Sequence, residues 1–171
     1  NHYMKAYKDF LPSIFFKRLE TIVSANNFPY YFQQTTLGKD KKESLDNFMF
    51  THVLFNDGKE RSDWFKIFEP IIYFISEKYE VNELLRMKLN LYTNQHKKIN
   101  HGSHKDYEGP LKLDIKLGLF NFITCNGGTK INKKLFNSNS NELIVFDNKF
   151  KHHGITQTDT PTRINLNIAW K

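Results

Sequence analysis

The chain has 171 residues and a mass of 20.3 kDa, enough for one domain with a hydrophobic core. Its hydrophobic share of 39% and charged share of 25% are those of an ordinary soluble globule. No apolar run approaches the roughly 20 residues of a membrane span, and no signal peptide is recognisable. The single cysteine, Cys125, excludes an internal disulfide, so we expect a cytoplasmic protein. The net charge of +7 permits an acidic partner such as nucleic acid, but the scattered lysines favour a solvated basic surface.

The first half of the chain combines helical and extended patterns. Apolar side chains at helical spacing predict the helices, and Pro70 is expected to kink the second one. The sequence Asn56-Asp57-Gly58 predicts a tight turn. The expected elements are a helix over 10–25, an extended segment over 28–32, a polar loop over 38–44, a strand over 47–55 and a helix over 62–80.

The second half is dominated by strand patterns, predicted over 85–93, 112–124, 129–131, 142–146 and 163–170. In the first of these strands, one face carries Leu85, Met87, Leu89 and Leu91, and the other carries Arg86, Lys88, Asn90 and Tyr92. In the last strand, one face carries Ile164, Leu166 and Ile168, and the other carries Arg163, Asn165 and Asn167. Strands in a row after two helices predict a double-sheet roll with helices packed on one face.

Three short motifs in the last 70 residues carry the chemistry. They are His104 and Asp106 in HGSHKDYEG, the doublet His152-His153, and Arg163 ten residues after the doublet. In an extended chain residues i and i+2 point the same way, so His104 and Asp106 can bind one metal. Two imidazoles and a carboxylate on one face of Fe(II) leave three positions open for a 2-oxo acid and O₂. Arg163 offers a planar fork of donors for a carboxylate.

These motifs give the chain a resemblance to a known family. It resembles the 2-oxoglutarate- and Fe(II)-dependent oxygenases of the prolyl-hydroxylase-like type, and is most similar to their small bacteriophage members. The matching stretches begin at residue 28 and follow the family order: FPYYF, FTHVLFNDG, LLRMKLNLYTN, HGSHKDYEG, NGGT and FDNKFKHHGITQTDTPTRINLNIAW. The resemblance implies a mainly β fold, a double-stranded β-helix (a jelly roll, or cupin-like fold) with supporting helices. It would be a single domain over 1–171, with a helical N-terminal part at about 8–80 and a jelly-roll core at about 47–171.

By the same resemblance, His104 and Asp106 are iron ligands, Arg163 binds the C5 carboxylate of 2-oxoglutarate, and Tyr92 hydrogen-bonds that cosubstrate. Asn167, four residues after Arg163 on the same face, is expected to line the cosubstrate pocket. The third ligand has two assignments. The phage-type pattern KHxGxTxTD selects His152, which we prefer, whereas the more general spacing of ten residues to the arginine selects His153.

The function expected from this resemblance is a dioxygenase that uses Fe(II), 2-oxoglutarate and O₂, with ascorbate as reductant in vitro. It would hydroxylate a substrate and release succinate and CO₂. A peptidyl residue such as proline is the first candidate substrate, ahead of a nucleobase or a small molecule. If the gene is a phage gene, the enzyme would act in the host-cell cytoplasm. Two alternatives remain open: a different cupin-like metalloenzyme, and a non-catalytic jelly-roll module that binds nucleic acid or protein.

Overall fold

The computed structural model describes residues 3–36, 45–108 and 114–171. The loop predicted over 38–44 lies outside the described residues, as do the first two residues of the strand predicted over 112–124. The elements, in chain order, are β1 (Met4–Tyr7), α1 (Ser13–Val23), β2 (Tyr31–Gln33), β3 (Met49–Asn56), β4 (Lys59–Glu60), α2 (Phe65–Phe68), α3 (Pro70–Ser76), β5 (Leu84–Thr93), β6 (Lys116–Asn121), β7 (Gly128–Ile131), β8 (Lys134–Asn137), β9 (Glu142–Asp147), β10 (His152–Ile155) and β11 (Thr162–Trp170).

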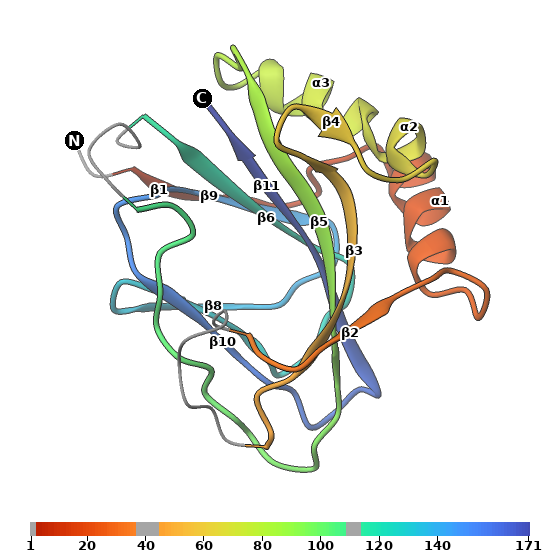
Figure 1. Cartoon of the computed structure of the whole chain (residues 1–171), viewed down its shortest axis with the longest axis vertical. Helices are drawn as coiled ribbons and strands as arrows, with labels where there is room; N and C mark the ends of the chain where they lie inside the picture. The colour runs from red at the N-terminus through yellow and green to blue at the C-terminus, as the bar shows by residue number, and fades with distance from the viewer. Residues whose placement is uncertain (1–2, 37–44, 109–113) are drawn as a thin grey trace.

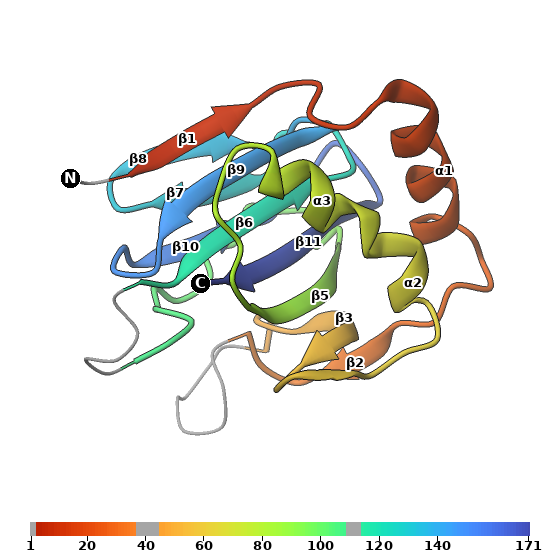
Figure 2. The same ribbon diagram turned by 90° about the horizontal axis from the view of Figure 1, so that it is seen from above.

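Two antiparallel sheets face each other. Within the described residues the large sheet has eight strands in the order β1-β9-β6-β11-β5-β3-β2, with β4 paired to β3, and the small sheet has the order β10-β7-β8. The three helices lie on one side of the large sheet and the small sheet on the other (Figures 1 and 2). This is the jelly roll with supporting helices that the sequence predicted. The large sheet extends further towards the N-terminus than the predicted core, because β1 pairs with β9 and β2 pairs with β3.

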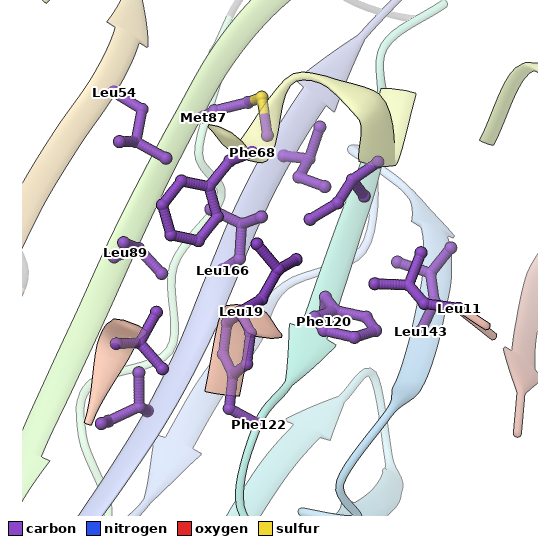
Figure 3. Packing of buried hydrophobic residues seen from close by; sticks show 14 of the residues in the cluster. Leu11, Leu19, Leu54, Phe68, Met87, Leu89, Phe120, Phe122, Leu143 and Leu166 are labelled. Carbon is purple, nitrogen blue, oxygen red and sulfur yellow. The ribbon is translucent and has the colours of Figure 1, made fainter. Parts of the chain in front are cut away.

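The main hydrophobic core lies between the helices and the outer face of the large sheet. Helix α1 buries Phe16, Leu19 and Val23 against this face, where Phe120 and Leu166 are also buried (Figure 3). Each such side chain contributes about 1.5–3 kcal/mol when fully removed from water. The predicted second helix is two short helices, α2 and α3, joined at Glu69. Pro70, at the first position of α3, has no N–H to donate back to the preceding turn, which accounts for the interruption.

A second hydrophobic cluster, which includes Ile131 of the small sheet and Phe146 of the large one, fills part of the space between the sheets. One prediction for β5 was wrong here. Leu85 packs against this inner cluster, whereas Leu84, Met87 and Leu89 belong to the outer core. The pairing of β11 with β5 shifts register between Ala169 and Trp170, and this irregularity breaks the strict alternation at the start of β5. From Arg86 onward the polar side chains alternate as predicted and face the inside of the roll.

Candidate functional site

The inside of the roll holds a cluster of two histidines and one aspartate. His104 lies directly opposite His152 in an isolated antiparallel bridge, with backbone N–H···O distances of 3.0 and 2.9 Å in the two directions. Residues paired in this way project their side chains to the same face, so the two imidazoles meet with ring centroids 4.5 Å apart. His153, the next residue of β10, points to the opposite face. The described residues that could hold a metal together are therefore His104, Asp106 and His152.

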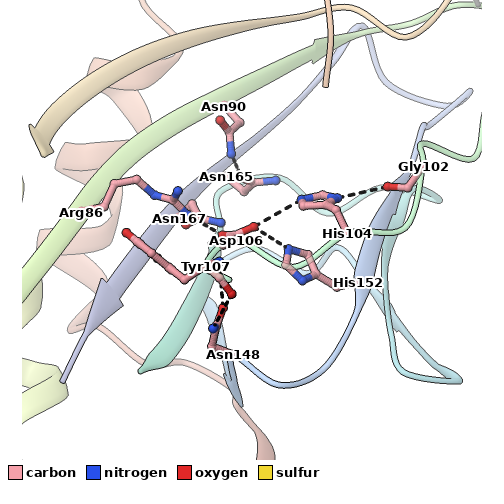
Figure 4. Close-up of polar contacts among 10 residues, drawn as sticks. All are labelled: Arg86, Asn90, Gly102, His104, Asp106, Tyr107, Asn148, His152, Asn165 and Asn167. Atoms are coloured by element: carbon pink, nitrogen blue, oxygen red, sulfur yellow. Dashed lines mark hydrogen bonds and ion pairs between the residues drawn. The ribbon is translucent and has the colours of Figure 1, made fainter. Parts of the chain in front are cut away.

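The three side chains converge on one point. The Nε2 atoms of His104 and His152 lie 3.3 and 3.1 Å from Asp106 Oδ1, and one candidate ligand atom from each residue lies within 4.8 Å of the others (Figure 4). The Nδ1 atom of His104 lies 3.0 Å from the carbonyl oxygen of Gly102, and a proton on Nδ1 would leave the Nε2 lone pair facing the cluster. Two imidazole nitrogens and one carboxylate are the donor set of a non-haem Fe(II) site, so these residues fit that metal.

Neighbouring polar side chains hold Asp106 in place. Arg86 donates hydrogen bonds to Asp106 Oδ2 and, at 2.6 Å, to Asn167 Oδ1. Asn148 closes a two-way clamp on the backbone of Tyr107, accepting from its N–H at 3.2 Å and donating to its carbonyl at 2.9 Å (Figure 4). The carboxylate of Asp106 is thus held by Arg86 of β5, and the backbone of the residue that follows it is held by Asn148.

Arg163 projects into the same cavity from β11. It is 1% exposed, and its guanidinium carbon lies 4.4 Å from the ring centroid of Tyr92. Its Nε and Nη2 atoms have no hydrogen-bond partner in the described residues. A buried guanidinium with unpaired donors is unfavourable unless a ligand pairs with it. A Cβ on Gly154 would lie 3.0 Å from Arg163 Nη2, so the absence of a side chain there leaves room beside the donors. These features fit a carboxylate ligand such as 2-oxoglutarate.

The pKa values of this cluster follow from burial and charge. Burial raises the pKa of Asp106, but hydrogen bonds with His104 and His152 and the charge of Arg86 outweigh burial, so this pKa lies well below its ordinary range. Burial raises the pKa of Tyr92, and the opposing charge of Arg163 does not cancel this effect. Tyr92 therefore keeps its phenolic proton at neutral pH and is able to donate it to a carboxylate.

One cavity of about 90 Å³ joins all of these groups. Every residue of the preferred sequence assignment lines it, namely His104, Asp106, His152, Arg163, Tyr92 and Asn167, whereas His153 does not. Several other polar residues line the cavity without a role predicted from the sequence, among them Arg86, Lys88, Asn90 and His101. The alternation of β5 already placed Arg86, Lys88 and Asn90 on one face. His101 was not recognisable, because the segment before His104 is irregular and only pairing with Gly154 and Ile155 brings it to the cavity.

No family model matches the chain, and neither does any curated protein. Solved structures do match it. A 2OG-Fe(II) oxygenase family oxidoreductase from Burkholderia pseudomallei has a TM-score of 0.71 and 10% identity, covering 99% of this chain and 84% of that one. A prolyl-4-hydroxylase from Pseudomonas putida has a TM-score of 0.65 and 12% identity, with coverages of 99% and 92%.

A prolyl hydroxylase from Trichoplax adhaerens, solved with a hypoxia inducible factor oxygen degradation domain peptide fragment, has a TM-score of 0.64 and 11% identity, with coverages of 98% and 83%. At these identities the likeness establishes the fold. The chain has the jelly-roll fold that these oxygenases share, as its sequence predicted. No helix in the described ranges is long and apolar enough to cross a membrane.

Proposed function

We propose that the chain is a 2-oxoglutarate- and Fe(II)-dependent dioxygenase that hydroxylates a C–H bond of its substrate. The observation that carries this proposal is one cavity with the His104–Asp106–His152 cluster and the unpaired donors of Arg163. Neither feature is specific by itself, because a histidine pair can be structural and a buried arginine can close an internal ion pair. A facial donor set for Fe(II) and a carboxylate receptor in the same cavity together match the needs of this chemistry.

In this proposal each residue has a defined task. His104, Asp106 and His152 hold Fe(II), Arg163 pairs with the C5 carboxylate of 2-oxoglutarate, and Tyr92 donates its phenolic hydrogen bond to the same cosubstrate. When bound, Fe(II) and 2-oxoglutarate supply the chemistry: O₂ provides one oxygen atom to a substrate C–H bond and one to succinate, and CO₂ leaves.

Other side chains of the cavity position these groups and exclude water. Arg86 and Asn167 keep Asp106 oriented through the hydrogen bonds described above. Phe146 packs its ring edge-on to His152 with centroids 5.1 Å apart and shields that imidazole from water. A dry, rigid surrounding strengthens each electrostatic contact inside it.

A peptidyl residue, with proline first, is the substrate we propose to test before others. This choice is supported by the prolyl hydroxylases among the structural neighbours and by the sequence resemblance. We further propose that the protein acts in the cytoplasm, with Cys125 buried and free. The assignment to small bacteriophage members of the class stays a prediction.

The test is succinate formation from 2-oxoglutarate by the purified protein with Fe(II), ascorbate and O₂, together with Fe(II) and 2-oxoglutarate binding measured without O₂. His104→Ala and His152→Ala should lose metal binding and turnover, whereas His153→Ala is the matched control and should keep both. Retained metal binding in His152→Ala with loss in His153→Ala would contradict the ligand assignment. If the wild-type chain bound neither iron nor 2-oxoglutarate, the non-catalytic binding module would be favoured instead.

A further inference from the structure

Lys88 is a lysine inside the cavity with no assigned task. It lies on β5 directly opposite Asn167 of β11, and it lines the same cavity as the ligand cluster. Arg86, on the same face of β5, is hydrogen-bonded to both Asn167 and Asp106, so Lys88 lies beside the residues that hold the candidate metal ligand Asp106. Within the ranges that the structure describes, the side chain of Lys88 makes neither a hydrogen bond nor an ion pair.

The other cations of the cavity are already committed. Arg86 is bonded to Asp106 and Asn167, and Arg163 is the candidate receptor for the cosubstrate. The described lining thus has three cationic side chains, Arg86, Lys88 and Arg163, and one carboxylate, Asp106. Fe(II) would add two positive charges and 2-oxoglutarate two negative ones, so the positive surplus would persist in the loaded site.

The cosubstrate does not supply a partner for Lys88. In the proposed function one end of 2-oxoglutarate would be bound at the metal held by His104, Asp106 and His152, and its C5 carboxylate would be bound by Arg163. Both charged ends of 2-oxoglutarate would therefore have partners other than Lys88. Arg163 of β11 lies opposite Tyr92 of β5 in the sheet. Tyr92 is four residues from Lys88, so the two are about 13 Å apart along the extended strand. An ammonium group that is partly withdrawn from water and has no ion-pair partner is unfavourable, so an anionic ligand beside it would be stabilised.

We propose that Lys88 receives a carboxylate of the primary substrate, so that the substrate class is one with an anionic group close to the reacting carbon. The inference rests on the proposed function and deepens it. Two kinds of substrate could supply this carboxylate: a free amino acid, through its α-carboxylate, or a peptide, through an acidic side chain next to the target residue. Lys88 would then select the substrate by charge and hold it beside the metal.

The test uses the full chain loaded with Zn(II) and saturated with 2-oxoglutarate, and acetate as the minimal carboxylate probe. Acetate binding is followed by saturation-transfer NMR in the wild type, in Lys88→Met and Lys88→Gln, and in the control Lys130→Met, whose lysine lies on β7 and does not line the cavity. We expect equal acetate affinity in the wild type and the control. Both Lys88 variants should bind acetate about tenfold or more weakly, the usual effect of losing one charge-assisted hydrogen bond, with little change in the affinity for 2-oxoglutarate.

Competition against acetate then separates the two sources. Free L-proline and the blocked dipeptide acetyl-prolyl-aspartyl amide are compared with their neutral counterparts, L-prolinamide and acetyl-prolyl-asparaginyl amide. The acids should displace acetate at lower concentration than the amides. Whichever acid competes better, free L-proline or the aspartyl dipeptide, shows whether the carboxylate belongs to a free amino acid or to a peptide side chain.

Three results with acetate would each overturn the inference: no saturable binding to the wild type, unchanged affinity in both Lys88 variants, or amides that compete as well as acids. A tenfold loss of 2-oxoglutarate affinity in Lys88→Met would also overturn it and assign Lys88 to the cosubstrate. Binding of 2-oxoglutarate to the wild type is measured before acetate is added. Failure at that step would contradict the proposed function and is therefore distinguishable from failure of the Lys88 inference.

Discussion

The charge on Lys88 should reduce the stability of the unliganded fold, and its removal should therefore stabilise the protein. Burial, followed by the charge of Arg86, lowers the pKa of Lys88 from its ordinary value of 10.5 to about 8, while Asp106 opposes this effect. A lysine pKa that falls this far on folding corresponds to a cost of about 3 kcal/mol for folding with the ammonium charged. Lys88→Met keeps most of the side-chain volume, removes the charge, and should raise the free energy of unfolding at pH 7 by about this amount.

The effect of pH has a definite sign. The unfolded chain keeps the Lys88 proton up to about pH 10.5, whereas the folded chain loses it near pH 8. Between these values the unfolded state binds more protons, so the stability of the wild type rises with pH relative to that of Lys88→Met. The advantage of the variant should thus fall from about 3 kcal/mol at pH 7 to about half of that near pH 9.5.

The assay is urea unfolding followed by circular dichroism, with EDTA present so that no metal contributes. Wild type, Lys88→Met and Lys130→Met are compared from pH 7 to pH 9.5, and only differences between proteins at the same pH are used. The Lys130→Met control should show no such trend, because Lys130 lies on β7 and does not line the cavity. A Lys88→Met advantage that stays constant with pH, or a variant less stable than the wild type at pH 7, would refute the reasoning.

Three further predictions concern the support of the cluster. Arg86→Met should weaken metal binding by about 10- to 100-fold in a competition titration with a chromophoric chelator, as expected when the partner of a ligating carboxylate is lost; unchanged affinity would remove Arg86 from this role. Gly154→Ala should weaken 2-oxoglutarate binding, measured calorimetrically, because the added Cβ approaches Arg163 Nη2 to 3.0 Å, and metal affinity should stay the same; equal loss of both would indicate general disruption. Asn148→Ala should destabilise the fold by about 1–3 kcal/mol in urea unfolding, since the N–H and carbonyl of Tyr107 lose their partner; a neutral result would show that water replaces the clamp.

The large sheet was predictable because its strands show strong local patterns. In β11, Ile164, Leu166 and Ile168 belong to the outer core. The alternating residues Arg163, Asn165 and Asn167 line the inner cavity, as the period-two alternation required. In β5 the alternation fails only at Leu85, which the register shift in the pairing with β11 passes over and which packs on the inner cluster. Such an irregularity depends on pairing with a distant strand and leaves no local signal in the sequence.

Within the site, too, local sequence patterns determined some assignments and contacts between distant segments determined others. The sequence by itself determined the residue types and their order: a His and an Asp two positions apart, a distant histidine doublet, and an arginine ten residues after the doublet. It also restricted the choice to one histidine of the doublet, because adjacent strand residues face opposite ways. Only the tertiary structure decided which of the two lies in the cavity. His152 pairs across an antiparallel bridge with His104, which lies 48 residues earlier in the sequence.

Contacts between distant segments also decided which charged side chains lie next to one another. Arg86 and Lys88 appear in the sequence only as polar residues of an alternating strand, among 25 lysines and arginines, whereas Arg163 was already predicted to bind a carboxylate. The fold alone pairs Arg86 with Asp106, places Arg163 over Tyr92, and leaves the side chain of Lys88 without an ion pair among the described residues. Local patterns fix which face a side chain takes, because the strand repeat is a property of the backbone. Which charges meet inside the roll depends on how strands far apart in the chain are paired, and that is set by the packing of the whole domain.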